Sequence, residues 1–343
     1  MAVDLSSLGW DDSLRAAYPG LSHPDHVAGR VARVDRGVCT VLTADGPVRA
    51  SLSGPVLCAG ADDPAALPCA GDWVAVRTWP DHRVTLEAVL PRRTAILRRT
   101  AGKGSVGQVL AANIDTAAIV EPMDPEPDVR RIERLLALAW DSGAEPLVLL
   151  AKADLAADPA AVADQVADVA PGVPVLAVSA EGGAGLEPLR PLVAAGRTLG
   201  LLGRSGAGKS TLVNALAGTP VMATQAIRRV DGKGRHTTSY RALIPIPGGG
   251  AVLDTPGLRG VGLLDASDGL DDAFADVADL AVTCRFADCR HAGEPGCAVQ
   301  AALDAGDLPV HRLESWRKLR RELGLEARRQ AARLRKQPRV RRD

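Results

Sequence analysis

Short runs in which apolar and polar residues alternate fill the first quarter of the chain. This period of two is typical of β-strands, and Asp35-Arg36-Gly37 and Asp45-Gly46 have the composition of hairpin turns. The runs that we interpret as strands are 27–34, 38–43, 48–52, 73–78 and 84–89. Such a succession predicts a small barrel, and an OB-type barrel fits best. Residues 1–26 show little periodicity, so we expect a loosely held, flexible N-terminal arm.

From residue 115 onward, apolar strand-like runs alternate with segments whose apolar residues recur at helical spacing. The strand-like runs are 116–120, 147–150, 173–178, 199–202, 241–246 and 251–253. The first helical segment, 129–139, has Asp128 in the N-cap position. The alternation predicts a parallel α/β domain with helices on both faces of the sheet. Residues 265–283 and 311–343 are expected to be helical.

Composition places the chain among ordinary globular proteins. Its 343 residues allow two or three domains, 46% of them are hydrophobic, and the net charge is zero. No apolar run reaches transmembrane length, and the first residues lack a signal-peptide pattern, so we expect a cytoplasmic protein with no membrane partner. Six cysteines are few for a disulfide scaffold.

The segment after run 199–202 has the glycine spacing of a phosphate-binding loop, and a helical pattern follows it, as the motif requires. Its backbone N–H groups would surround phosphate oxygens, Lys209 would neutralise the β- and γ-phosphates, and Ser210 would hold Mg²⁺. The alternative is a glycine-rich surface turn. The expected nucleotide-binding residues of this loop are Gly203, Arg204, Ser205, Gly206, Ala207, Gly208, Lys209, Ser210 and Thr211.

Asp254-Thr255-Pro256-Gly257 directly follows run 251–253. An aspartate there can hold Mg²⁺ through water, and the Gly257 N–H can meet a γ-phosphate. Between the two motifs, Thr237 or Thr238 would complete the Mg²⁺ shell when triphosphate is bound. The pair can equally be β-prone residues entering the next strand.

Two weaker segments have the composition of a guanine-reading site. In Ala151-Lys152-Ala153-Asp154, the carboxylate could accept both N–H donors of the guanine edge while the lysine stem lies along the purine. Ser179-Ala180 could supply a backbone N–H to the guanine oxygen. These segments precede the phosphate loop, whereas in ordinary GTPases they follow it. The order predicts a circularly permuted GTPase.

Cys284, Cys289, His291 and Cys297 have the spacing of a zinc site. Three thiolates and one imidazole complete a tetrahedral shell with no open position, so we expect one structural Zn²⁺ rather than a catalytic one. The alternative is a set of reduced buried cysteines beside an unrelated histidine.

Basic residues concentrate in two segments. The connector with Arg92, Arg93, Arg98, Arg99 and Lys103 is either a solvated linker or a strip that contacts phosphates. The tail 311–343 is rich in arginine, including Arg312, and suits RNA phosphates, or else forms a solvated helix face. The barrel either contacts RNA or is purely structural. The tail residues expected to pack on the zinc module are Leu313, Trp316, Leu319 and Leu323.

The string Gly234-Arg235-His236-Thr237-Thr238 and the Cys/Cys/His/Cys spacing resemble the small-ribosomal-subunit-dependent GTPase family RsgA, also called YjeQ. The resemblance implies binding to the small ribosomal subunit and its rRNA late in maturation, with hydrolysis of GTP to GDP when docked. It implies Zn²⁺ on the cluster, Mg²⁺ with GTP, and guanine reading by Lys152 and Asp154. We expect a monomer with four parts: an arm (1–26), an OB-type barrel (27–92), a permuted GTPase domain (105–264) and a zinc-binding helical domain with a basic tail (265–343).

Two positions depart from what is usual. The family carries Asn or Thr where this chain has Ala151, and the lost hydrogen bond predicts nucleotide binding weaker by about 1 kcal/mol. Many GTPases carry a water-orienting Gln where this chain has Leu258, so intrinsic hydrolysis should be slow. His236 is then the catalytic candidate, although it can instead contact RNA or cap its loop. An RNA-binding scaffold that senses GTP and GDP with little turnover is the alternative function.

Overall fold

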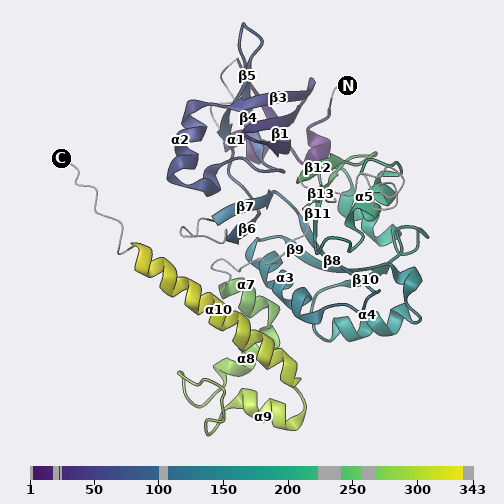
Figure 1. Cartoon of the computed structure of the whole chain (residues 1–343), viewed down its shortest axis with the longest axis vertical. Helices are drawn as coiled ribbons and strands as arrows, with labels where there is room; N and C mark the ends of the chain where they lie inside the picture. Colours follow the sequence, from purple (N-terminus) through teal and green to yellow (C-terminus); the bar gives the residue numbers. More distant parts are fainter. Residues whose placement is uncertain are drawn as a thin grey trace, which may run out of the picture.

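The computed structural model describes residues 3–17, 23, 25–99, 107–222, 241–255 and 267–334. Figure 1 shows three parts along the long axis: a barrel, an α/β domain beside it, and a helical domain at the opposite end. The α/β domain lies in the middle and contacts both of the others.

The predicted barrel is confirmed, and it closes in the strand order β1-β2-β3-β5-β4. Its apolar residues point inward at every second position, and Val31, Val41, Val74 and Leu86 fill its core. Its strands and helix are β1 (His26–Asp35), β2 (Val38–Thr43), β3 (Gly46–Leu52), α2 (Gly54–Asp62), β4 (Trp73–Thr78) and β5 (Val84–Val89).

Residues 3–17 differ from the loosely held arm that the sequence suggested. They form a short 3₁₀ helix, Ser6–Leu8, and helix α1 (Asp12–Ala16). Leu8 and Leu14 are buried in the main apolar cluster together with barrel and α/β residues. The expectation failed because the apolar partners of these two leucines come from distant parts of the sequence.

The basic connector is more ordered than the solvated linker that was one interpretation of it. A hairpin of β6 (Ala95–Arg99) and β7 (Gly107–Ala112) replaces the expected linker. Arg92 pairs with the buried carboxylate of Asp72, with its Nε 2.7 Å from the nearer oxygen. Arg92 is therefore structural, whereas Arg93 forms an exposed ion pair with Asp11.

The α/β domain contains a sheet in the order β10-β9-β8-β11-β13-β12. The predicted parallel α/β domain is confirmed, with one difference at an edge of the sheet, where β12 runs antiparallel to β13. A tight turn joins these two strands, whereas parallel neighbours need a long crossover. The strands are β8 (Thr116–Pro122), β9 (Glu145–Ala151), β10 (Val175–Val178), β11 (Thr198–Leu202), β12 (Ala242–Pro245) and β13 (Ala251–Asp254).

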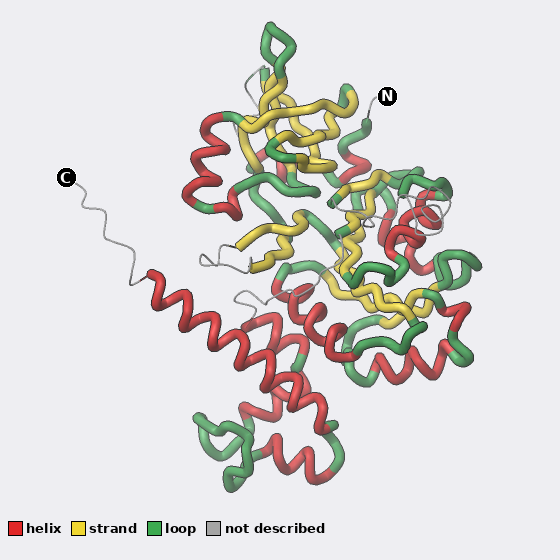
Figure 2. Tube along the Cα trace, in the orientation of Figure 1, coloured by secondary structure: helices red, strands yellow, loops and turns green. Residues whose placement is uncertain are grey.

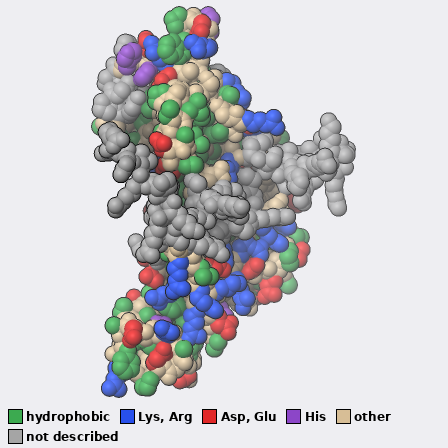
Figure 3. Space-filling model, turned by 60° about the vertical axis from the view of Figure 1, so that its left-hand side comes forward, with side chains coloured by type: hydrophobic (Ala, Val, Ile, Leu, Met, Phe, Trp, Pro, Cys, Tyr) green, Lys and Arg blue, Asp and Glu red, His purple; other side chains and the backbone are tan. Residues whose placement is uncertain are grey.

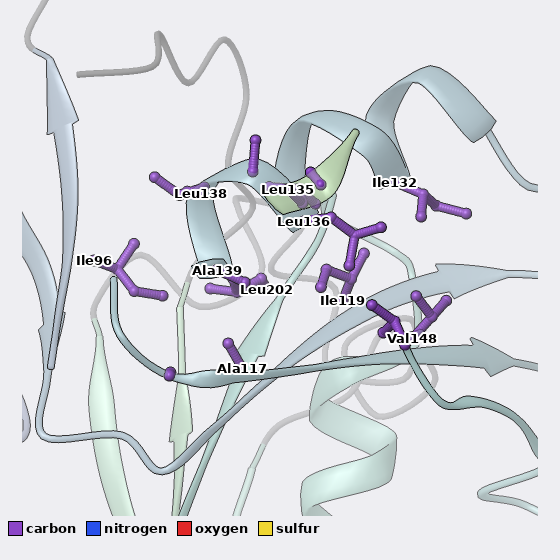
Figure 4. Packing of buried hydrophobic residues seen from close by; sticks show 14 of the residues in the cluster. Ile96, Ala117, Ile119, Ile132, Leu135, Leu136, Leu138, Ala139, Val148 and Leu202 are labelled. Carbon is purple, nitrogen blue, oxygen red and sulfur yellow. The ribbon is translucent and has the colours of Figure 1, made fainter. Parts of the chain in front are cut away.

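Helices cover both faces of this sheet, as predicted (Figure 2). The helices are α3 (Val129–Asp141), α4 (Pro159–Ala167) and α5 (Lys209–Ala217). Helix α3 begins at the predicted N-cap, where the Asp128 carboxylate accepts from the Arg131 N–H. Its leucines and Ile132 pack on the strand residues Ile119 and Val148 (Figure 4).

The C-terminal domain is helical and joins the main apolar cluster. Leu313, Trp316 and Leu319 are buried in the cluster that contains Cys297, as predicted, and Leu323 packs against its edge. Arg312 is fully buried, so it is not one of the exposed basic residues of the tail. The helices are α7 (Ser267–Ala273), α8 (Ala275–Val282), α9 (Ala298–Ala305) and α10 (Val310–Leu334). Within the described residues, no helix combines the length and apolar character needed to cross a bilayer.

Candidate nucleotide and metal sites

The phosphate loop lies between β11 and α5, in the strand, loop and helix context that the motif requires. Gly203 needs to be glycine, because its φ is +153° and a Cβ would lie 2.3 Å from the Val120 carbonyl oxygen. The ammonium group of Lys209 donates to the carbonyl oxygens of Gly203 (2.9 Å) and Arg204 (3.0 Å). The lysine therefore crosses the loop, and its side chain is buried.

Asp254 and Lys209 form the electrostatic centre of this site. Burial raises the pKa of Asp254 to about 6, while the charge of Lys209 and a hydrogen bond with Ser210 oppose that shift. Burial lowers the pKa of Lys209, which the charges of Asp254 and Glu121 partly offset. Phosphate loop and Asp254 thus lie together, as the sequence predicted. The neighbouring Thr255 hydroxyl donates to the Leu201 carbonyl (2.6 Å) and fixes the end of β13 on β11.

Glu121 is a residue that the motif analysis missed. It is buried at the end of β8 and lies 3.3 Å from Arg131 Nε on helix α3. Burial raises its pKa, and Arg131 and Arg204 lower it. An acid within the apolar run around 116–122 was the available signal, because a buried carboxylate needs a cationic neighbour.

A pocket of about 270 Å³ is lined by both the proposed guanine-reading residues and the phosphate loop. Ala180 and Glu181 contribute to its lining, as does the start of α5. Its lining residues are Ala151, Lys152, Asp154, Leu155, Val178, Ala180, Glu181, Gly208, Thr211 and Leu212. Segments that are far apart and permuted in the sequence therefore share one cavity.

Ser179 has a different place from the one expected. Its backbone N–H already donates to the Ala184 carbonyl, so only Ala180 of this pair has a backbone N–H left to offer the pocket. The Ser179 hydroxyl instead donates to Asp154 (2.5 Å) and accepts from the Gly182 N–H (3.1 Å). The serine therefore holds the Asp154 carboxylate in a fixed orientation.

Ala151 packs directly against the phosphate loop. A Cβ placed on Gly208 would lie 3.4 Å from the Ala151 side chain. A longer polar side chain at position 151 would therefore reach the loop and could form a hydrogen bond with it. Ala151 cannot form that hydrogen bond. The remaining site predictions, His236, Thr237, Thr238 and Gly257, lie outside the described residues.

Cys284, Cys289, His291 and Cys297 form a cluster that fits a tetrahedral metal ion. Their ligand atoms all lie within 4.8 Å of one another. The Sγ atoms of Cys284 and Cys297 are 3.9 Å apart, and His291 Nδ1 is 3.5 Å and 3.6 Å from them. Zinc–sulfur bonds of about 2.3 Å at the tetrahedral angle separate two sulfurs by about 3.8 Å. The residues can thus hold a metal ion.

Hydrogen bonds within the loop stabilise the conformation around the cluster. The Glu294 carboxylate accepts from the backbone N–H groups of Ala292 (2.6 Å) and Arg290 (3.1 Å). Trp316 of α10 packs on the His291 ring at 5.5 Å between centroids. These contacts orient the ligands and connect the cluster to α10.

A phosphate loop whose base-side segments precede it in the chain defines the molecule as a circularly permuted P-loop GTPase. A barrel and a helical domain whose cysteine and histidine cluster could hold a metal ion flank its catalytic domain. The RsgA GTPase family model matches residues 89–264. The chain belongs to the RsgA GTPase family and is a GTPase.

Individual relatives agree with this assignment. The small ribosomal subunit biogenesis GTPase RsgA of Streptomyces coelicolor is 56% identical over 321 residues, which is 93% of this chain and 86% of the relative. The crystal structure of YjeQ from Thermotoga maritima has a TM-score of 0.65 at 25% identity, covering 87% of this chain and 98% of that one. YloQ, described as a circularly permuted GTPase, shares the fold with a TM-score of 0.60 at 21% identity, covering 89% and 97%.

Proposed function

We propose that this GTPase acts in late maturation of the small ribosomal subunit and hydrolyses GTP to GDP and phosphate when docked there. The observation that carries the proposal is the shared pocket of Asp154 and the phosphate loop. The relatives named small ribosomal subunit biogenesis GTPase support the choice of partner.

In this proposal, the Asp154 carboxylate accepts the two N–H donors of guanine, and Ser179 keeps it oriented. The Lys152 stem lies along the purine, and the Ala180 N–H reaches the guanine oxygen. At this edge adenine has a donor where guanine has an acceptor, and an acceptor where guanine has a donor. A carboxylate held in one orientation therefore rejects adenine. Ala151 offers no hydrogen bond to the loop, and affinity is lower as a result.

The phosphates lie over the backbone N–H groups of residues 203–211 and the N-terminus of α5. Lys209 exchanges its carbonyl partners for β- and γ-phosphate oxygens, which are stronger acceptors because they are charged. Ser210 and Asp254, with Thr238, would hold Mg²⁺, which supplies charge neutralisation at the phosphates. The influence of the Ser210 side chain on the pKa of Asp254 supports a shared position for these two side chains. His236 as the group that orients water stays a prediction.

The cysteine and histidine cluster binds one structural Zn²⁺ in this account, with all four ligand positions filled by the protein. The fit of the donor set to tetrahedral distances supports zinc. The ion would hold the loop of residues 284–297 in the shape that packs on α10.

Ribosomal RNA is the proposed macromolecular partner, and the protein is expected to act as a monomer in the cytoplasm. Lys and Arg side chains gather over one face of the lower half of the molecule (Figure 3). A hollow of about 590 Å³ between the metal cluster and α10 has one acid, Asp288, among its lining residues. Its arginines are Arg290, Arg317, Arg320 and Arg321. Such a density of cations favours an RNA backbone.

Turnover measured with and without small ribosomal subunits tests the proposal. We expect slow hydrolysis alone and at least tenfold stimulation by subunits, with loss of both rates in Lys209→Ala and no change in the surface variant Arg190→Ala. Equal turnover with and without subunits, while they still bind, would favour the scaffold that only senses nucleotide. Ala151 is the residue that favours this second function, because it weakens the nucleotide site.

A further inference from the structure

One backbone carbonyl connects the two strands that carry the phosphate site. The Ser7 oxygen accepts hydrogen bonds from the Gly196 N–H and the Gly250 N–H, both at 2.7 Å. Gly196 lies just before β11, which ends at the phosphate loop, and Gly250 lies just before β13, which ends at Asp254. At about 3.3 Å per residue, each strand is a short rigid link from Ser7 to the nucleotide site.

Close packing around Gly250 restricts movement of the two strands relative to the Ser7 carbonyl. Gly250 has a φ of +78°, and a Cβ there would lie 2.2 Å from the Ala194 carbonyl oxygen. The turn of β12 and β13 is therefore pressed against the chain that enters β11. The Ala251 N–H donates to the Arg197 carbonyl (2.9 Å), which starts the pairing of β13 with β11 at the same point. A displacement of either strand along its axis must move the Ser7 carbonyl.

The segment that contains Ser7 also packs against the barrel. Arg30 of β1 is fully buried, and its guanidinium donates to the carbonyl oxygens of Leu8, Gly71 (3.3 Å) and Asn113 (2.7 Å). The Trp10 ring packs on Trp73 with 5.1 Å between centroids. Farther along the segment, the Val3 N–H donates to the Ala44 carbonyl in the turn of β2 and β3 (3.1 Å).

We propose that residues 3–17, the N-terminal strap, position the barrel relative to the nucleotide site and couple the two. When the site changes its occupant, β11 and β13 shift the Ser7 carbonyl, and the barrel follows through Leu8 and Arg30. Coupling between two sites is reciprocal, so docking of the barrel alters nucleotide affinity by the same factor. This inference rests on the proposed guanine nucleotide site and adds a structural connection from that site to the barrel.

Hydrogen exchange of the full chain with GDP and with a non-hydrolysable GTP analogue tests the coupling. We expect exchange in the barrel peptide 26–35 to differ at least threefold between the two nucleotides. The difference should disappear in a variant that lacks residues 2–17. Arg15→Ala, whose exposed side chain is in the same segment, is the matched control and should keep the difference. A difference that persists without the strap, or that is absent in the full chain, would overturn the proposal.

A second variant covers the case in which the deletion does not fold. Leu8→Ala with Leu14→Ala removes the buried anchors but leaves the backbone in place. It should reduce the nucleotide-dependent difference at 26–35, and an undiminished difference would count against the strap. Direct binding of each nucleotide is measured in parallel. Loss of guanine nucleotide binding in the full chain would contradict the proposed function itself, whereas binding without a barrel response contradicts the strap alone.

Discussion

The two junctions between the parts of this molecule are each centred on a buried arginine, but the partners differ. At the barrel junction, Arg30 donates to three neutral carbonyl oxygens from three segments. At the helical junction, Arg312 pairs with the buried Glu133 (3.2 Å) and with Asp276 (2.6 Å). It also donates to the backbone of Val169 and Ala273.

Because their partners differ, the two junctions should respond differently to pH. Carbonyl partners do not titrate, and burial lowers the pKa of Arg30 only to about 10, so the barrel junction keeps its charges at neutral pH. The helical junction depends on a carboxyl group whose pKa is raised by burial, so its charges depend on pH. We therefore expect the barrel junction to be constant and the helical junction to be sensitive to acid and metal removal.

Metal removal should have the largest effect and should reach only the helical junction. A structural zinc ion contributes roughly 10 kcal/mol of apparent binding free energy, which is lost with the ion. A strong chelator, or Cys289→Ser, should unfold residues 284–297 and accelerate their hydrogen exchange. Peptides of residues 3–17 should exchange as before. Equal acceleration in both regions would show that the junctions are not independent.

Arg312→Met should cost about 3–5 kcal/mol in free energy of unfolding at pH 7, because it leaves the Glu133 carboxylate buried without a cation. The loss should be smaller at pH 5, since the raised pKa lets Glu133 take up a proton. Adding Glu133→Gln should recover part of the loss. Arg190→Met, a surface ion pair, is the control and should cost under about 1 kcal/mol. An equal loss of unfolding free energy at pH 5 and pH 7 would contradict the proposed difference between the two junctions.

Arg30→Met should cost about 3 kcal/mol, because it leaves the buried carbonyl oxygens of Leu8 and Asn113 without a donor, while that of Gly71 keeps the Asn113 side-chain amide. In contrast to Arg312→Met, the cost should be the same at pH 5 and pH 8. Arg49→Met, on the exposed surface of the same barrel, serves as the control. Urea unfolding at both pH values measures the difference, and a strong pH dependence would contradict the account of this junction.

Asp254 gives an expected effect no larger than that of Arg30, at most about 3 kcal/mol, in the protein without nucleotide. Its pKa is raised to about 6 in the folded state, so the folded protein binds its proton more tightly than the unfolded chain does. The free energy of unfolding contributed by Asp254 therefore falls as the pH rises from about 4 to about 6, and is constant above. Comparing urea unfolding of wild type and Asp254→Asn across this range isolates the contribution, and parallel curves would contradict it.

Local patterns made the barrel and both sites predictable. The barrel strands alternate with a period of two, the phosphate loop has fixed glycine positions, and the cysteine and histidine cluster lies within 14 consecutive positions, 284–297. Asp128 was identified as an N-cap because capping depends on a few adjacent residues. In each case the sequence signal and the physical constraint are close together in the chain.

The junctions were not predictable, because their partners are distant in sequence. Leu8 and Leu14 lie in a segment with little periodicity, and only the barrel and the α/β domain supply their apolar neighbours. Arg312 read as one cation of a basic tail, yet Glu133 lies far upstream. The β6 and β7 hairpin was hidden because its first strand ends in arginines and resembles a solvated connector. Long-range pairing decides all three.

The central claim is that permuted segments close into one guanine nucleotide pocket, and base selectivity of Asp154→Asn tests it most directly. An amide at this position offers one donor and one acceptor, which suit the xanthine edge rather than that of guanine. We predict that GTP affinity falls at least a hundredfold while xanthosine triphosphate binding appears. Unchanged GTP affinity, with no gain for xanthosine triphosphate, would contradict the account.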